Sequence, residues 1–351
     1  MTLLIVTGLL GSVGVTSSYA ADPPTPSPKT SSPPATTAPE PSRATFGIQP
    51  ASATTRDPRP FLSFIATKGA SADDHVSVVN YSVAPLVLAV YATDALNNAD
   101  GGFGLLPAAT KPTDAGSWVQ LKIPGGGPTV TVPGRSSTGA PGEVIVPFHL
   151  SIPANATPGD HVGGVIAALS TVSTDPNNPN VRLDQRIATR LYIRVAGALQ
   201  PQLKVEKLKV SYVGKSPLGG DAKISYRVHN VGNVKLGGRT KVAVQGLLGT
   251  QSTTNLPDFP LLLPGSSLDF SVTVKNVIPE ISEKAKVTIV PLVVPGDNDP
   301  DLHNYSASRH FFAIPWILLA VVLLLLVIGS LVWRWWRLRK SDDTAGSEVT
   351  S

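Results

Sequence analysis

The chain has 351 residues, 42% of them hydrophobic, with 29 Lys or Arg, 24 Asp or Glu and no cysteine. A net charge of +5 that is dispersed along the chain is too weak for a nucleic-acid footprint, so we expect no nucleic-acid partner. Without disulfides, exported domains must be held by core burial alone, which favours a bacterial exoplasmic protein over an animal receptor.

The N-terminal region is predicted to be a secretory signal followed by a spacer. Residues 1–20, MTLLIVTGLLGSVGVTSSYA, are apolar and end in small residues, as a signal-peptidase site requires, although no Lys or Arg precedes the apolar run. Residues 21–44 contain eight prolines and almost no apolar side chain. Such a segment cannot bury a core, so we expect an extended, disordered spacer.

From Thr45 to about Asn298 the sequence consists of short alternating runs separated by Gly, Pro, Asn and Asp, which is typical of an all-β fold. Two sets of such runs predict two tandem Ig-like β-sandwiches, over residues 45–198 and 199–298. The clearest strands of the first set are His75–Asn80, Leu86–Ala92, Glu143–Ile152, Gly163–Val172 and Ile187–Val195.

The two sets repeat the same local pattern. In VSVVNYSVAPL and SYRVHNVGNVKL a strand runs through an asparagine, Asn80 or Asn230, into a tight turn and then a new apolar run. Pro141-Gly142 and Pro264-Gly265 each precede a further strand. The repetition indicates two copies of one type of module.

The first module contains an insertion of about 45 residues, Asp94–Ala140, which is long enough to suggest a functional loop. Within it, DAGSWVQLKI predicts a strand anchored by Trp118. The stretch DALNNADGG places oxygen ligands near one turn, but its spacing is not that of an EF-hand, and an ordinary hairpin turn is the favoured interpretation. The oxygen-bearing residues there are Asp94, Asn97, Asn98 and Asp100.

No catalytic or metal-binding motif is present. Asp160 and His161 are adjacent, but the other histidines show no ligand spacing, so we interpret the pair as part of a turn that leads into a strand. The sequence has no GxSxG, SxxK or Walker motif and therefore predicts a non-enzyme without cofactor or metal. A pair of carboxylates for glycan hydrolysis, brought together only by the fold, remains an open alternative.

The C-terminal region predicts a membrane anchor. Residues 311–333 contain no charge and are long enough for a helix that spans a bilayer, preceded by a linker over residues 299–310. Basic residues follow at once, which predicts a single-pass type I protein with a cytoplasmic tail over residues 334–351. The residues expected to form the anchor and its interface are Phe311, Trp333, Arg334, Trp335, Trp336 and Arg337.

The order of several motifs resembles that of the WxL-interacting proteins of Gram-positive bacteria. These motifs are FGIQPAS, VVNYS, the TDxxxNADG loop, SWVQL and VPFHLSIPANATPGDHVGGVIAAL, and the resemblance extends over about residues 45–340. It implies a first module similar to a peptidoglycan-binding domain and a second similar to a module that binds host or partner proteins. The long Pro-rich spacer and the composition rich in Ala, Pro and Thr depart from that family and suggest an actinobacterium.

We therefore expect a non-catalytic protein of the cell membrane that binds peptidoglycan or another cell-wall glycan, a co-encoded surface protein, or both. The residues expected to contact the ligand are Trp118, Asn97, Asn98 and Asp100. A scaffold or sensor subunit of an envelope complex is the main alternative, and an envelope glycan hydrolase is the third.

Overall fold

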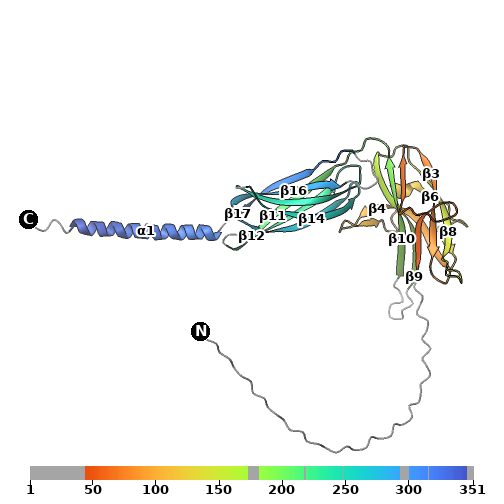
Figure 1. Cartoon of the computed structure of the whole chain (residues 1–351), viewed down its shortest axis with the longest axis horizontal. Helices are drawn as coiled ribbons and strands as arrows, with labels where there is room; N and C mark the ends of the chain where they lie inside the picture. Colours follow the sequence, from red (N-terminus) through yellow and green to blue (C-terminus); the bar gives the residue numbers. More distant parts are fainter. Residues whose placement is uncertain are drawn as a thin grey trace, which may run out of the picture. The chain divides into compact units, whose positions relative to one another are not determined.

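The computed structural model describes residues 44–172, 182–216, 219–247, 249–292, 300–314 and 316–345. Over these ranges the chain forms two Ig-like β-sandwiches and then one long helix (Figure 1). This is the all-β fold class with a C-terminal apolar helix that the sequence predicts. The expected secretory signal, the spacer up to residue 43 and the last six residues of the tail lie outside the described residues.

The first sandwich packs a four-stranded sheet, in the order β1-β3-β8-β6, against a sheet in the order β2-β10-β9-β4-β5, with β7 also paired to β4. Strand β2 pairs parallel to β10, and the other neighbours are antiparallel. Alternation along β8 directs Val146, Phe148 and Leu150 into the core. The elements are β1 (Phe46–Ala51), β2 (Leu62–Ala66), β3 (Ser71–Asn80), β4 (Leu86–Asn97), β5 (Phe103–Leu105), η1 (Ala115–Trp118), β6 (Val119–Leu121), β7 (Thr129–Val132), β8 (Gly142–Ser151), β9 (Gly159–Val172) and β10 (Arg182–Val195).

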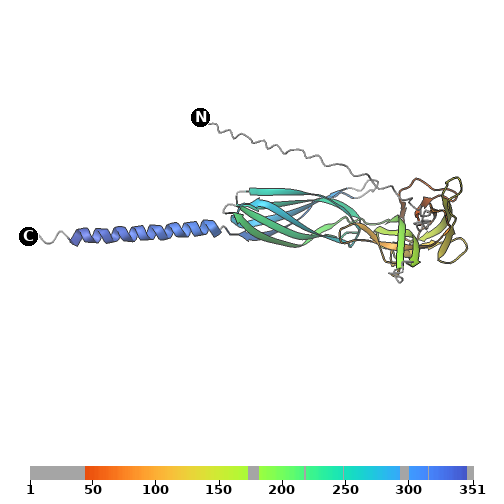
Figure 2. The ribbon, with the colours of Figure 1, turned by 90° about the horizontal axis from the view of Figure 1, so that it is seen from below.

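The second sandwich packs a three-stranded sheet, β11-β12-β15, against a four-stranded sheet, β14-β13-β16-β17. Its strands are long and run side by side with a marked twist (Figure 2). Alternation along β16 buries Ala285, Val287 and Ile289. The strands are β11 (Leu203–Ser216), β12 (Gly219–Asn230), β13 (Leu236–Gly246), β14 (Gly249–Leu262), β15 (Ser267–Val277), β16 (Ile281–Leu292) and β17 (Tyr305–Ala313).

The repeated asparagine forms the same turn in both sandwiches. Asn80 is fully buried at the end of β3, where its amide donates to the carbonyl of Ala84 at 2.9 Å and its Oδ1 accepts from the Ser82 amide. Asn230 is equally buried at the end of β12, and it bonds Val234 and Gly232 in the same positions. A side chain that satisfies buried backbone groups in this way fixes the turn between paired sheets.

The insertion of the first module is largely ordered and is built into both sheets. Its strands β5 and β7 pair with β4, while β6 pairs with β8 in the opposite sheet. The predicted strand around Trp118 begins instead as the short 3-10 helix η1, and only Val119–Leu121 is extended. Trp118 is 7% exposed and packs in the core, so its large ring anchors the insertion.

The C-terminal boundary differs from the prediction. Strand β17 occupies the second half of the expected linker over residues 299–310, and it continues to Ala313 because its partner β16 offers a full ladder of hydrogen bonds. Phe311, expected in the membrane helix, is 8% exposed and belongs to the core of the second sandwich. Helix α1 begins at Trp316 and ends at Ala345, so part of the expected tail is helical.

Helix α1 is long and apolar enough to cross a membrane over Trp316–Arg337, and no side chain of that span is buried in the protein. The expected interface residues Trp333, Arg334, Trp335 and Arg337 lie in its second half, together with Trp336. The guanidinium carbon of Arg337 lies 4.2 Å from the centre of the Trp333 ring. This cation–π contact places a charge beside an aromatic ring, as interfacial anchors commonly do.

Candidate functional site

The two sandwiches are joined by a buried ion cluster centred on Asp160, at the start of β9. Arg194, opposite it on β10, donates two hydrogen bonds to the carboxylate, from Nε at 2.6 Å and from Nη2 at 2.8 Å. Lys235, which precedes β13 in the second sandwich, donates its backbone amide at 2.8 Å and lies with its Nζ 3.5 Å away. One carboxylate therefore connects two cations from different modules.

The cluster is shielded from water, which makes its electrostatics strong. The side chains of Asp160, Arg194 and Lys235 are 3%, 12% and 7% exposed. Burial by itself would raise the pKa of Asp160, but the hydrogen bonds from Arg194 and the charge of Lys235 lower that pKa below its ordinary value. The carboxylate is therefore ionised at neutral pH. Its removal would take from Arg194 and Lys235 the negative charge that both of them contact.

Backbone contacts reinforce the same junction. The amide of Asp160 donates to the carbonyl of Asn233 at 2.7 Å, and the Asn233 side chain donates to the carbonyls of Pro158 and Ala198 at 2.9 Å each. Gly159 has a φ of +120°, and a Cβ at this position would collide with the Asn233 carbonyl. Gly159, the first residue of β9, is thus needed for close approach of the second module.

His161 holds the insertion against the same end of the first sandwich. Its Nδ1 lies 2.6 Å from the Asp114 carboxylate and its Nε2 lies 2.9 Å from the carbonyl of Thr157. Because both neighbours are acceptors, the protonated ring can donate to both of them. Burial would lower the pKa of His161, but these two partners raise it above its ordinary value. The ring also packs on Trp118, with 4.6 Å between ring centres.

Asp160 and His161 were predicted to belong to a turn that leads into a strand; the strand entry is confirmed, but the strand begins earlier, at Gly159. Both residues lie within strand β9, and both side chains are buried in ion pairs. The β9–β10 register sets Asp160 opposite Arg194, and no local sequence pattern reveals this pairing. No group of three or more His, Asp or Glu residues that could hold a metal ion converges within the described parts of the chain.

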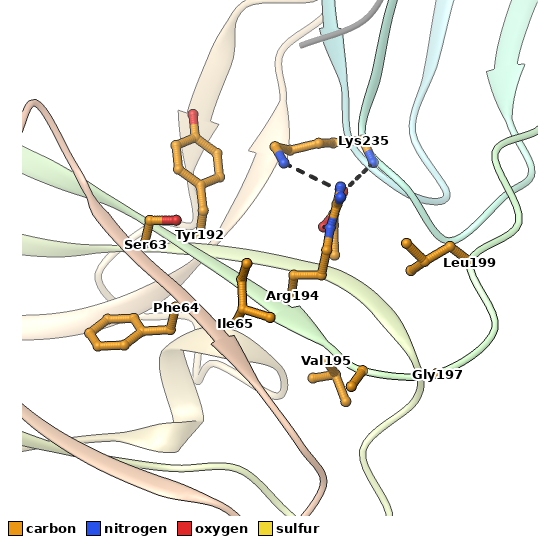
Figure 3. A pocket seen from close by; sticks show the side chains of 11 residues that line it. Ser63, Phe64, Ile65, Tyr192, Arg194, Val195, Gly197, Leu199 and Lys235 are labelled. Atoms are coloured by element: carbon orange, nitrogen blue, oxygen red, sulfur yellow. Dashed lines mark hydrogen bonds and ion pairs between the residues drawn. The ribbon is translucent and has the colours of Figure 1, made fainter. Parts of the chain in front are cut away.

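A cavity of about 360 Å³ opens beside the ion cluster (Figure 3). Phe64 and Ile65 of β2 and Leu199 between the modules supply apolar side chains to its lining, and Arg194 and Lys235 supply the charged ones. The Lys235 Nζ lies 5.5 Å from the centre of the Tyr192 ring. This cavity belongs to the module junction, and its polar groups are engaged in holding the junction together.

The predicted contact residues of the insertion serve structural roles or form an ordinary turn. Asn97 also joins the modules, because its amide donates to the carbonyl of Leu261 at 2.8 Å and its Oδ1 accepts from the Leu263 amide at 2.9 Å. Asn98 and Asp100 are exposed in the β4–β5 hairpin, where Asp100 accepts from the Gly102 amide. Trp118, buried in the core, is not available to a ligand.

The calcium alternative for the same loop conflicts with the position of Asp94. Its carboxylate accepts three backbone amide hydrogen bonds, from Thr113 at 2.7 Å, Asp114 at 3.0 Å and Gly116 at 2.7 Å. The side chain therefore points into the insertion and organises η1. Asn97 Oδ1 accepts from the Leu263 amide and Asp100 accepts from the Gly102 amide, which fits the hairpin interpretation of the loop.

A surface groove of about 560 Å³ lies on the outer face of the first module, and the sequence did not predict it. One row of paired residues, Thr129, Ala89, Ala168 and Arg186, crosses β7, β4, β9 and β10 in register. The two alanines at the centre of this row leave a hollow between larger side chains. Pro107 and Ala108 of the insertion line the groove as well.

Tyr91 supplies the aromatic group of this groove, and Arg186 and Asp184 supply its charged groups. The guanidinium carbon of Arg186 lies 5.8 Å from the centre of the Tyr91 ring, and Arg186 Nη2 donates to the carbonyl of Leu106 at 2.7 Å. The Tyr91 hydroxyl is buried and makes no hydrogen bond within the described part of the chain. An aromatic face beside a cation and small residues suits binding of a flat, hydroxylated ligand.

The sequence matches no protein-family profile, and no curated protein matches it either. Among solved structures, the class 5 fimbriae chaperone CfaA has a TM-score of 0.37 at 12% identity, over 76% of this chain and 99% of its own. The CupB2 chaperone of Pseudomonas aeruginosa has a TM-score of 0.30 at 11% identity, over 70% and 96%. A family 123 glycoside hydrolase from Clostridium perfringens has a TM-score of 0.25 at 12% identity, over 45% and 28%. All three TM-scores are below 0.5, so these similarities carry no inference about the ligand.

Proposed function

We propose that the chain is a non-catalytic surface protein, anchored in the cell membrane by α1 and binding cell-wall glycan, a surface protein, or both through its two sandwiches. This is the role that the resemblance to the WxL-interacting proteins implies. The observation that carries the proposal is helix α1, whose span Trp316–Arg337 has no buried side chain and no packing partner for its apolar surface within the described residues. A lipid bilayer is the environment that accommodates such a helix.

The orientation follows from the basic residues at the C-terminal end of the span and after it. Arg334 and Arg337 lie in the second half of α1, and further basic residues follow in the sequence. Under the positive-inside rule, the C-terminus is cytoplasmic and both sandwiches are outside the cell.

The groove around Tyr91 and Arg186 is the surface that best suits a wall glycan. Its volume of about 560 Å³ falls in the range of ligand sites, and it lies on the first module, the one whose motifs resemble a peptidoglycan-binding domain. The Tyr91 ring can pack on a sugar face, and Arg186 can donate to hydroxyl or carboxylate groups of the glycan.

A surface-protein partner is the second candidate and is favoured by charge. Residues 199–313 contain 13 Lys or Arg and nine Asp or Glu, whereas residues 45–198 contain ten of each. The basic second module suits an acidic partner, as a scaffold subunit of an envelope complex would require.

Sedimentation of the full chain in detergent with purified peptidoglycan tests the wall-binding function. We expect the wild type to sediment with the wall and Tyr91→Ala and Arg186→Ala to lower the bound fraction at least several-fold. Arg239→Ala, which removes an exposed arginine of the second module, is the matched control and should bind normally. Failure of the wild type to sediment would eliminate wall binding, and normal binding by both groove variants would eliminate the groove.

A further inference from the structure

We infer that the end of the second sandwich next to α1 carries a membrane-contacting apolar surface, which rests in the interfacial layer of the bilayer that α1 enters. This surface, called the apolar tip below, consists of Leu247, Ile278, Ile281, Phe312 and Ile314. The inference rests on the proposed membrane anchoring and goes beyond it, because it assigns a lipid contact to the β-sandwich itself.

The members of the apolar tip come from three connections that meet at one end of the sandwich. Leu247 lies in the β13–β14 hairpin, which closes at the pair Gly246 and Gly249. Ile278 lies between β15 and β16, and Ile281 begins β16. The register pairs Ile281 with Ala313, the last residue of β17, so the end of β17 lies at the same end of the sheet.

Hydrogen bonds hold these connections together. The Leu247 amide donates to Glu280, and the Gln251 side chain donates to the same carboxylate at 2.8 Å. The Ile278 amide donates to Gln251 Oε1 at 2.9 Å. The hairpin and the β15–β16 connection therefore form one ordered unit that presents its apolar side chains outward.

Exposure of these side chains is unusual for a solvated turn. Leu247 is 82% exposed, Phe312 is 74% exposed and Ile281 is 61% exposed. Polar residues would serve a hairpin in water equally well, and a group of large exposed apolar residues usually marks a binding surface. Ile281 also has a φ of +72°, an unfavourable conformation for a β-branched residue.

The short connection between β17 and α1 places the apolar tip close to the membrane surface. Only residues 314 and 315 separate β17 from α1, so Ala313 and Trp316 are at most roughly 10 Å apart even in an extended chain. Trp316 begins the apolar span, and tryptophan is favoured at the membrane interface. The polar layer of a bilayer is roughly 5–8 Å thick on each side. The end of β17, and Ile281 paired to it, is therefore held at the lipid headgroups whatever the tilt of α1.

The charges at this end do not oppose the contact. Lys215 is paired with Asp221, and Glu280 accepts the hydrogen bonds described above. Lys275 and Lys284 lie near the same end, and their long side chains can reach phosphate groups while the apolar residues enter the interface. The contact is thus mainly apolar, and we expect it with zwitterionic as well as anionic lipid.

The absence of cysteine from the sequence makes a direct test possible, because a single introduced cysteine can be labelled without background. Leu247→Cys and, separately, Phe312→Cys would be labelled with an environment-sensitive fluorophore on the full chain in phosphatidylcholine nanodiscs that contain nitroxide-labelled lipid. The matched control is Val290→Cys on the same strand as Ile281, which is 38% exposed and roughly 30 Å along β16. Leu324→Cys in α1 reports on the anchor.

We expect strong nitroxide quenching at positions 324, 247 and 312, with quenching at position 290 at least several-fold weaker. Quenching at position 324 alone would overturn the apolar tip and leave the anchor intact. No quenching at position 324 would overturn the anchor, and with it the tip. A fluorophore at position 247 that becomes shielded without being quenched would assign this surface to a protein contact and would also overturn the inference.

Discussion

The two sandwiches share a turn but differ in what surrounds it. Asn80 and Asn230 make equivalent hydrogen bonds at the ends of β3 and β12. In the first module an insertion then builds extra strands onto both sheets, and positive and negative charges are balanced. The second module has no such insertion in its described residues, is basic, and ends in exposed apolar connections.

This difference shows how one architecture is adapted to two positions along a chain. The first module gains a ligand-sized groove because the insertion lies beside an outer sheet face. Only two residues separate the second module from α1. The end of the module next to the helix exposes apolar side chains. The buried Asp160 cluster connects the module that carries the groove to the module that precedes α1.

The largest expected effect comes from removing the link between the modules. Asp160→Ala leaves Arg194 and Lys235 buried without the carboxylate, and loss of one partner of a buried pair typically costs about 3–5 kcal/mol. We expect the free energy of unfolding to fall by this amount and the two modules to unfold in separate transitions. Calorimetry of the full chain in detergent measures both. A single transition with unchanged midpoint would show that the cluster does not couple the modules.

The next effect concerns Glu283, a buried carboxyl of the second module with one oxygen that makes no hydrogen bond within the described residues. Burial raises the pKa of Glu283 to about 7 from an ordinary value of 4.5, so the folded state favours the protonated form. Its contribution to stability is therefore fully present below about pH 4.5 and is lost as the pH rises towards and through 7.

Glu283→Gln removes this pH dependence because an amide stays neutral. We expect the variant to be more stable than the wild type by about 1–3 kcal/mol at pH 8 and nearly equal to it at pH 4.5. Urea denaturation of both proteins at the two pH values, monitored by far-ultraviolet circular dichroism, gives the two free energies of unfolding to compare. The same small difference at both pH values would contradict the assignment of the pKa to Glu283.

The shared asparagine turn predicts matched effects in the two modules. Asn80→Ala and Asn230→Ala each remove the amide that satisfies buried carbonyl groups, which typically costs about 1–3 kcal/mol. We expect the two losses to be similar, as measured by the unfolding midpoint of the affected module. A large loss for one variant and none for the other would mean that the repeated turn has different roles.

The smallest effect is expected for an exposed ion pair of the second module. Asp269 accepts two hydrogen bonds from Arg227 on the outer face of the β11-β12-β15 sheet, where its side chain is 65% exposed. Asp269→Ala should therefore lower the free energy of unfolding by less than about 1 kcal/mol, and salt should reduce the difference further. A loss as large as that of Asp160→Ala would show that burial does not explain the contrast between the pairs.

Strands β14 and β17 were not predicted from the sequence, for identifiable reasons. Strand β14 is rich in polar residues and contains Pro257 and Pro260, which normally argue against a central strand. It is an edge strand, where proline is tolerated. Strand β17 was predicted as a linker because its first half, YSASRH, is polar, whereas pairing with β16 makes it a strand.

The candidate site was predictable only in part. The insertion was recognised from its length and its Gly, Pro and Thr content, yet the exposed groove on it was not, because its floor consists of two alanines from different strands. Trp118 and Asn97 looked like surface residues of a polar loop. The structure makes Trp118 a core residue and Asn97 a bridge between modules.

Sequence periodicity by itself determined the all-β modules, their repeated Asn turn and the single apolar helix, because these depend on neighbours within a few residues of the chain. Only the tertiary structure decided which polar side chains are buried between the modules and which apolar ones remain exposed at the end beside α1. Asp160 meets Lys235 75 residues away, and Ile281 meets Ala313 across a strand pair. Such contacts are set by sheet register and packing, which local patterns do not specify.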